Sequence, residues 1–531
     1  MWIEWLNNIK TGAISFWESI DVSKVVDLFV YDGQNPLMFN TGLFLFLFVG
    51  FIWIYRLLAR RDTLRIYFVI LFSLYFYYKS SGLCFLLLLF VALSDYSLGR
   101  LLGWVSWKWM RRFFVLMSMA VNLGMLCYFK YTNLLLGTIA DFTREPFEPL
   151  DIVLPIGISF FTFRSLSYII DVYRRQMSPV TNLRDYVFYL SFFPPLAAGP
   201  VVRAKDFVPQ IHRPLEITPM LLGEGLFLVM CGLIKKVVIS DYISVNFVDR
   251  IFDNPMLYTG FENLMGVYGY TLQIYCDFSG YSDMAIGLGA VLGFHFPENF
   301  NYPYIAASVK DFWHRWHISL STWFKEYVYI PLGGNRKGLP RQLFNILVVW
   351  MLTGIWHGAG WNFALWGLYF GVFLSAEKLI GKKWKERSFK IADISANNDS
   401  NGGDRKNMFL ICARNSIEHG YVLLVVLFSF VIFRVESVRE IKEQLLGLAG
   451  SYGNAMTPMA AYEIKSYLIL LLIACAGATP FPAMCVQRLK NTNMWKKSGW
   501  LLQSCYILTG LVLATAFLLG SSVHPFLYFR F

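Results

Sequence analysis

The sequence predicts an all-α polytopic membrane protein, and three observations lead to this fold class. Hydrophobic residues make up 56% of the 531 residues, aromatic residues 18% and charged residues only 15%, a composition that ordinary soluble domains do not have. Apolar runs close to membrane length recur from residue 37 to residue 520. Basic connecting segments alternate with acidic ones. The net charge of +12 therefore fits an excess of Lys and Arg in cytoplasmic loops and does not indicate nucleic-acid binding.

Most of the apolar runs approach the ~20 residues that a tilted helix needs to cross ~30 Å of hydrocarbon. Residues 2–30 precede them and carry aromatic side chains among polar neighbours, which suits an interfacial helix. We therefore expect an N-terminal interfacial region, 1–36, and one transmembrane domain, 37–531, with both termini outside. The expected spans are residues 37–58, 64–78, 83–99, 113–129, 152–170, 220–240, 263–293, 420–434, 467–486 and 500–520.

Two apolar segments do not fit a simple crossing. Residues 186–200 are too short, contain two Pro motifs and have basic residues on both flanks, so we expect a re-entrant segment surrounded by protein or by a water-filled cavity. Residues 343–375 also lie between two basic regions. They are expected to form a hairpin whose turn is marked by Gly354, Gly358 and Gly360, which would carry His357 well into the membrane. The polar residues 388–416 are expected to form a flexible cytoplasmic loop.

Three of the seven histidines, His314, His317 and His357, lie between residues 311 and 366. His357 is in the middle of the predicted hairpin, where an ionisable side chain is costly and tends to line a cavity or pathway. His317 and His357 could converge, and a neutral imidazole acting as general base contributes ~10²- to 10⁴-fold in rate. The second imidazole could orient the first, hold the acceptor or stabilise an oxyanion. Both could equally be hydrogen-bonded structural rings.

A metal site is not expected, because His314 and His317 share a helix face but have no further suitable ligands beside them. The eight cysteines lie mostly in apolar segments and are interpreted as small buried hydrophobic residues. Asp277 and Asp283 lie in a long apolar segment and could either hydrogen-bond within the core or line a substrate path. The sequence has no Gly-x-Ser-x-Gly elbow. Direct acyl transfer is therefore simpler than an acyl-serine route.

Several ordered motifs resemble the membrane-bound O-acyltransferase family, in its bacterial branch of alginate O-acetyltransferase-like proteins. Lipoteichoic-acid D-alanyl transfer proteins are relatives of that branch. The resemblance covers the chain from about residue 37 to the end. It rests on residues 154–163, 193–200, 277–283, 296–304, 312–320, 329–336, 356–362 and 525–531.

The resemblance implies a ring of tilted helices with re-entrant segments around a central tunnel in the bacterial cytoplasmic (inner) membrane. It implies an acyltransferase that passes an acetyl group from acetyl-CoA, or from an acyl carrier, to an acceptor used for O-acetylation of an extracellular or periplasmic polysaccharide. The family's two active-site positions fall on His357, as base or proton shuttle, and on His317, which would position or polarise the acyl carbonyl. His314 receives no catalytic role.

The remaining expectations concern the tunnel and the partners. Candidate tunnel residues are Asp311, Trp313, Trp316, Trp356, Asn362 and Asp283. No bound cofactor is expected. The implied partners are membrane lipids, an SGNH-like extracytoplasmic acetyltransferase with a Ser-His-Asp site, and a polysaccharide synthase complex. Two alternatives stay open: a non-enzymatic transporter whose histidines relay protons, and a scaffold for a glycan synthase complex.

Overall fold

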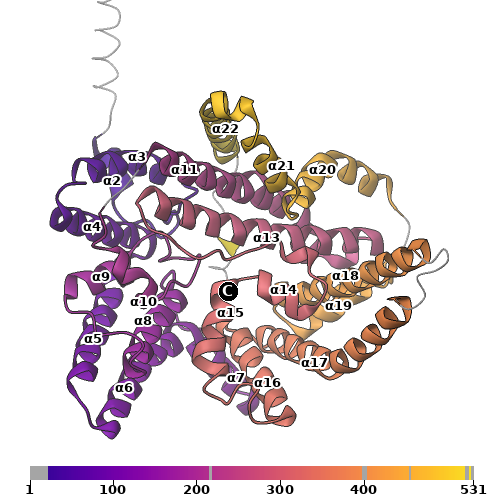
Figure 1. The fold of residues 1–531 in the computed structure, drawn as a ribbon, viewed down its shortest axis with the longest axis horizontal. Coiled ribbons are helices and arrows are strands. Elements are labelled where there is room, and N and C mark those ends of the chain that lie inside the picture. Colours follow the sequence, from indigo (N-terminus) through magenta and orange to yellow (C-terminus); the bar gives the residue numbers. More distant parts are fainter. Residues whose placement is uncertain (1–21, 215–217, 397–403, 454–455, 521–525, 528–531) are drawn as a thin grey trace, which may run out of the picture.

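The computed structural model describes residues 22–214, 218–396, 404–453, 456–520 and 526–527 (Figure 1). These residues form helices and turns, with no β-strand among them. The first part of the chain contains α2 (Val22–Phe29), α3 (Gly42–Leu57), α4 (Asp62–Ser81), η1 (Gly82–Cys84), α5 (Phe85–Trp104), α6 (Lys108–Leu126), η2 (Cys127–Tyr131), α7 (Thr132–Thr143), α8 (Ile158–Tyr173), α9 (Leu183–Ser191), α10 (Ala204–Phe207), η3 (Val208–Gln210), α11 (Pro219–Leu233), η4 (Ile234–Asp241) and η5 (Ser244–Val248).

The second part of the chain runs from residue 249 to residue 520. It contains α12 (Asp249–Asp253), η6 (Pro255–Leu257), α13 (Gly260–Val291), η7 (Pro303–Ile305), α14 (Val309–Arg315), α15 (Ile318–Phe324), η8 (Lys325–Tyr329), α16 (Leu339–His357), α17 (Trp361–Ala396), α18 (Asp404–Arg434), α19 (Val438–Leu448), α20 (Pro458–Gly477), α21 (Phe481–Lys490) and α22 (Asn493–Gly520).

Six helical stretches within the described ranges are long and apolar enough to cross a membrane. They are residues 62–104, 108–143, 361–381, 413–434, 460–477 and 497–519. Their outer faces expose large apolar side chains such as Leu71, Trp104 and Val512. Exposed apolar surface on this scale suits contact with lipid rather than with water. The all-helical polytopic fold predicted from composition is therefore confirmed.

Helix α13 lies in the middle of the molecule, with α11 alongside it (Figure 1). Glycines on both helices let the backbones approach: a Cβ at Gly232 of α11 would lie 2.3 Å from the Gly280 carbonyl oxygen, and one at Gly287 of α13 would lie 2.6 Å from that of Gly225. Small residues at such crossings are typical of membrane helices. Most of α13 is buried, which allows this predicted span to carry polar residues that a lipid-facing helix could not.

Helices α16 and α17 form the hairpin predicted over residues 343–375 (Figure 1). The two helices cross at glycines, where a Cβ on Gly354 would lie 2.2 Å from the Phe363 carbonyl oxygen and a Cβ on Gly367 2.3 Å from that of Trp350. The turn spans residues 358–360 and so contains Gly358 and Gly360, whereas Gly354, also predicted to mark the turn, lies within α16. Helix α16 therefore ends at His357, and the close contact of the two backbones leaves little room for the helices to shift.

Residues 186–200 behave as expected of a segment that cannot cross a membrane. Helix α9 ends at Ser191, and residues 192–200 form bends and turns without a helix. All residues from 188 to 202 are buried. This irregular backbone is thus enclosed by protein, which is one condition under which it is tolerated at membrane depth.

Two predicted boundaries need correction. Residues 388–396 continue α17, and residues 404–416 begin α18, so the predicted loop over 388–416 is helical on both sides; residues 397–403 lie outside the described residues. The span predicted at 467–486 is divided between α20, which ends at Gly477, and α21, which begins at Phe481, with Pro480 at the break between them. Most of the predicted interfacial helix, residues 2–21, also lies outside the described residues.

Candidate active site

His357 is the last residue of α16 and lies at the inner end of the hairpin, with only 3% of its surface exposed. Gly358 follows it, and a Cβ at Gly358 would lie 2.0 Å from the Phe363 ring. The turn therefore needs a residue without a side chain directly after the histidine. This close packing of Phe363 against Gly358 constrains the backbone directly after His357.

The carbonyl groups at the end of α16 are satisfied by a distant segment. The π-helix η2 supplies Lys130, whose Nζ donates to the Trp356 oxygen at 2.9 Å and to the His357 oxygen at 2.8 Å. Tyr131 donates its hydroxyl to the Ile355 oxygen at 2.7 Å. A cation near the C-terminal carbonyls of a helix interacts favourably with its dipole. Lys130 and Tyr131 thus hold the end of the helix that presents His357.

His317 connects α14 to α15 and is completely buried. Its backbone is left-handed, with φ 44° and ψ 55°, a conformation that is uncommon for a residue with a side chain. Its Nδ1 lies 3.1 Å from Asn299 Oδ1, whereas its Nε2 has no hydrogen-bond partner among the described residues. The ring also packs edge-on against Phe278, with 4.6 Å between centroids.

The structure brings the two histidines to the same indole. The Trp356 ring lies 6.0 Å from the His317 ring and 5.1 Å from the His357 ring, measured between centroids. The two imidazoles are also close enough to interact electrostatically. Both predicted histidines therefore pack against Trp356, but only His357 is among the residues that line the neighbouring cavity.

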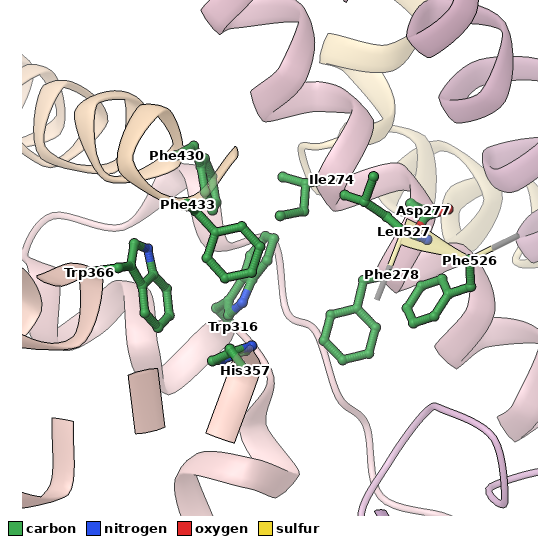
Figure 2. A pocket seen from close by; sticks show the side chains of 10 residues that line it. All are labelled: Ile274, Asp277, Phe278, Trp316, His357, Trp366, Phe430, Phe433, Phe526 and Leu527. Atoms are coloured by element: carbon green, nitrogen blue, oxygen red, sulfur yellow. The ribbon is translucent and has the colours of Figure 1, made fainter. Parts of the chain in front are cut away.

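His357 lines a cavity between α13, the hairpin and the C-terminal segment (Figure 2). The cavity encloses about 20 Å³, room for a water molecule but not for an acyl group. An acyl group can enter only if aromatic side chains of the lining move. His357, Trp316, Trp366, Phe430 and Phe433 line one side in Figure 2, and Ile274, Asp277, Phe278, Phe526 and Leu527 line the other.

Asp277 is the one carboxylate in this lining, and its oxygens are engaged. One oxygen lies 2.6 Å from Lys236 Nζ, and the other accepts the Leu527 backbone N–H at 3.0 Å. Asp277 thus ties the C-terminal segment and η4 to α13. Of the two interpretations left open for Asp277, these contacts favour a hydrogen-bonding role in the core, although the side chain also borders the cavity.

The predicted tunnel residues divide into two groups. Trp316 lines the cavity, Trp356 packs near both histidine rings, and Trp313 is buried with its ring 5.7 Å from that of Trp366. Asn362 is buried at the start of α17 and donates to the Phe433 oxygen at 3.5 Å. These four side chains therefore surround the histidines or border their immediate neighbours.

The two predicted carboxylates lie elsewhere. Asp311 forms an ion pair with Arg315 at 3.0 Å, and Asp283 forms one with Lys235 at 2.7 Å. Neither is among the residues that line the cavity. Each carboxylate is paired with a neighbouring cation, so these contacts favour a structural role over a place in the substrate path.

In the part of the chain that the structure describes, no group of three or more His, Cys, Asp or Glu side chains is placed to hold a metal ion. His314 is exposed on α14, whereas His317 is buried beyond the end of that helix. The two histidines therefore differ in environment. The spacing of His314 and His317 alone would have permitted metal ligation, but one side chain is exposed and the other is buried.

Sequence reasoning missed Lys130 and did not assign Asn299. Lys130 directly follows a predicted span, where a lysine normally reaches back to the membrane interface; the only signal for another role was its place beside a long apolar run. Asn299 lies within the motif 296–304. Its role depends on a contact with a residue 18 positions away, which the motif alone does not indicate.

Chemically, two buried imidazoles surrounded by aromatic rings suit proton transfer to and from a substrate that has displaced water. Removing water strengthens each polar interaction with the substrate. A general base close to an acyl carbonyl accelerates attack by a hydroxyl group. The geometry therefore fits acyl transfer without a serine nucleophile.

Comparison with known proteins agrees with this chemistry. Residues 74–395 match the profile of the MBOAT, membrane-bound O-acyltransferase family. The chain is 35% identical over 519 residues to the probable alginate O-acetylase AlgI of Pseudomonas putida, covering 93% of this chain and 100% of that protein. It is 31% identical over 541 residues to the peptidoglycan O-acetyltransferase of Helicobacter pylori, covering 93% and 98%.

A more distant relative is the teichoic acid D-alanyltransferase of Bacillus subtilis, 29% identical over 269 residues that cover 48% of this chain and 67% of that protein. The family profile spans more than half of the chain, and two relatives align over nearly their whole length. The acyltransferase activity and the multi-pass membrane fold expected from the sequence are therefore confirmed. The chain belongs to the membrane-bound O-acyltransferase family.

Proposed function

We propose that this acyltransferase takes an acetyl group from acetyl-CoA on the cytoplasmic side of the bacterial cytoplasmic membrane. It transfers the group to a hydroxyl acceptor that serves O-acetylation of an extracytoplasmic polysaccharide. The observation that carries the proposal is the pair of buried imidazoles packed against the Trp356 indole, one of which lines a cavity. The names of the two full-length relatives support acetyl transfer to a glycan.

In the proposed reaction, the acceptor oxygen forms a bond to the acyl carbon while its proton passes to one imidazole. The thioester C–S bond then breaks, and the leaving thiolate takes up a proton from the site. The other imidazole orients the reacting groups or stabilises the oxyanion, an effect that is strong where water is excluded. His317 and His357 are the residues to which we assign these roles.

We further propose that the acetyl group reaches the sugar through a separate SGNH-like partner outside the membrane. This partner supplies a Ser-His-Asp site. No such site is evident in the sequence of this chain. A polysaccharide synthase complex would deliver the glycan to it. Co-purification of such a partner with the full chain, and its loss when the polysaccharide genes are removed, would test this assembly.

Alanine substitution at His357 and at His317 tests the catalytic assignment. Each change should lower the acetyl content of the polysaccharide, and acetyl-CoA consumption by the purified protein, by at least ~10²-fold, the lower end of general-base effects. H314A is the matched control, because His314 is close in sequence but exposed, and it should retain activity. Wild-type acetylation in both H357A and H317A would contradict the proposal.

A further inference from the structure

Asn299 connects three separate motifs beside His317. It is 1% exposed, and its Oδ1 lies 3.1 Å from His317 Nδ1, 2.8 Å from Ser319 Oγ and 3.3 Å from the Ser319 backbone nitrogen. Its Nδ2 donates to Ser282 Oγ at 3.0 Å. Its main-chain oxygen accepts the Ile318 N–H at 3.0 Å. Asn299 thus contacts the ring of His317 and the two residues that follow it.

Two backbone N–H groups fix the direction of these hydrogen bonds. The Ser319 N–H can only donate, so the Asn299 atom that faces it must be the carbonyl oxygen. The Val201 N–H donates to Ser319 Oγ at 2.9 Å. The Ser319 hydroxyl is therefore free to direct its own proton to Asn299 Oδ1. No rotation of the amide satisfies these donors equally well.

The orientation of Asn299 determines the tautomer of His317. An amide oxygen 3.1 Å from Nδ1 is a favourable partner only if Nδ1 carries a proton, because two facing lone pairs repel. A fully buried imidazole without a carboxylate partner is neutral. The single proton of the neutral ring is then on Nδ1, and Nε2 carries a lone pair.

We infer that Asn299 is a positioning residue that fixes His317 in the neutral Nδ1–H tautomer, so that His317 presents a lone pair, and not an N–H, at Nε2 during acyl transfer. This inference rests on the proposed function. It also revises the role expected from the family resemblance. A neutral ring with its proton on Nδ1 has no N–H at Nε2 with which to polarise an acyl carbonyl.

The backbone at His317 supports the assignment. Its left-handed conformation, φ 44°, is strained for a residue with a side chain and persists where surrounding contacts enforce it. The Asn299 main-chain oxygen and side-chain oxygen bond to the N–H groups of Ile318 and Ser319, directly after the turn. Asn299 therefore holds both the backbone and the ring of His317.

Nitrogen chemical shifts of the histidine rings test the tautomer directly. The full chain would be labelled with ¹⁵N-histidine in lipid, and His317 assigned as the signal lost in H317Q. We expect a protonated Nδ1 and an unprotonated Nε2 in the wild type, and a loss of this state in N299A. N301A is the control, because Asn301 is exposed in the same loop. A wild-type ring protonated on Nε2 would overturn the inference, whatever the variants do.

Kinetics provide a second test. With acetyl-CoA as donor, N299A should lower the rate by about 10²-fold or more, as loss of an orienting group does at other histidine bases. N299D keeps the acceptor oxygens and favours the imidazolium form, so its pH–rate profile should lose activity at a higher pH than the wild type. A structural role alone would lower stability without moving the profile.

The outcomes separate this inference from the proposed function. If H317A is inactive while N299A leaves both the ring shifts and the pH profile unchanged, the inference fails and the proposed function stands. If H317A retains wild-type acetylation, the proposed role of His317 fails even where the tautomer is the one inferred. An N299D profile that coincides with the wild type would overturn the inference.

Discussion

Replacing Gly354 with alanine should push apart the two helices that form the His357 hairpin. A Cβ at this position would lie 2.2 Å from the Phe363 carbonyl oxygen and 3.0 Å from the Gly367 Cα. Both neighbours are backbone atoms, which cannot rotate away as the end of a side chain could. The helices must therefore separate locally by on the order of 1 Å to restore ordinary contact.

The expected effect is larger on activity than on stability. Overpacking costs typically ~1–3 kcal/mol, of which the better helix propensity of alanine offsets ~1 kcal/mol. Gly354 is one turn before His357, so the displacement reaches the imidazole. A misplacement of ~1 Å at a catalytic group can cost ~10²-fold in rate. G354A should accordingly unfold at a lower temperature and acetylate ~10²-fold more slowly.

The assay is acetyl-CoA consumption by purified protein in detergent, with thermal unfolding measured on the same samples. G381A is the matched control: Gly381 is in α17, and a Cβ there would meet nothing within 4 Å. That control should keep its activity and gain ~0.5–1 kcal/mol in stability. If G354A matches the wild type in rate and in melting temperature, the tight crossing does not position His357.

Two further changes address the support of the site and the ion pair between Glu326 and Arg203. K130M removes the donor of the buried Trp356 and His357 carbonyls, each worth ~1–3 kcal/mol when left unsatisfied; it should lower the unfolding temperature and the acetylation rate, and unchanged values would contradict the capping role. The pKa of Glu326 is lowered from 4.5: burial raises it, but the hydrogen bond and charge of Arg203 outweigh burial. The stability from this pair is present above pH 4.5 and is lost as the pH falls below it, so E326Q should lose ~0.2–1 kcal/mol at neutral pH and show a flatter decline of Tm with acid; parallel Tm curves would refute this.

Much of the fold followed from hydropathy and charge. The hairpin was predictable because the apolar segment 343–375 is too long for a single crossing, contains several glycines and has basic residues on both flanks. The extension of α17 through residues 388–396 was not, because these residues mix polar and apolar types of mostly middling helix propensity, a composition that fits a loop as well as a helix. The span at 467–486 was misplaced because its apolar residues outweighed the break at Pro480.

The site was predictable only in part. The cost of an ionisable group within an apolar segment identified His357, and the family motifs identified His317. The groups that hold these rings depend on tertiary contacts. Lys130 bonds to carbonyls 226 and 227 residues away in the chain, and nothing in its local sequence specifies that partner. The cavity likewise includes Phe526 from the far end of the chain.

The most direct test of the account is an experimental structure of the full chain with a non-hydrolysable acetyl-CoA analogue. We expect the acyl group to occupy an enlarged form of the cavity lined by His357, Trp316 and Phe433. Its carbonyl group should lie within hydrogen-bonding reach of the imidazoles, ~2.6–3.2 Å directly or through one water molecule. An analogue bound with its acyl carbon out of reach of both His317 and His357, in a lining that stays closed, would contradict the account.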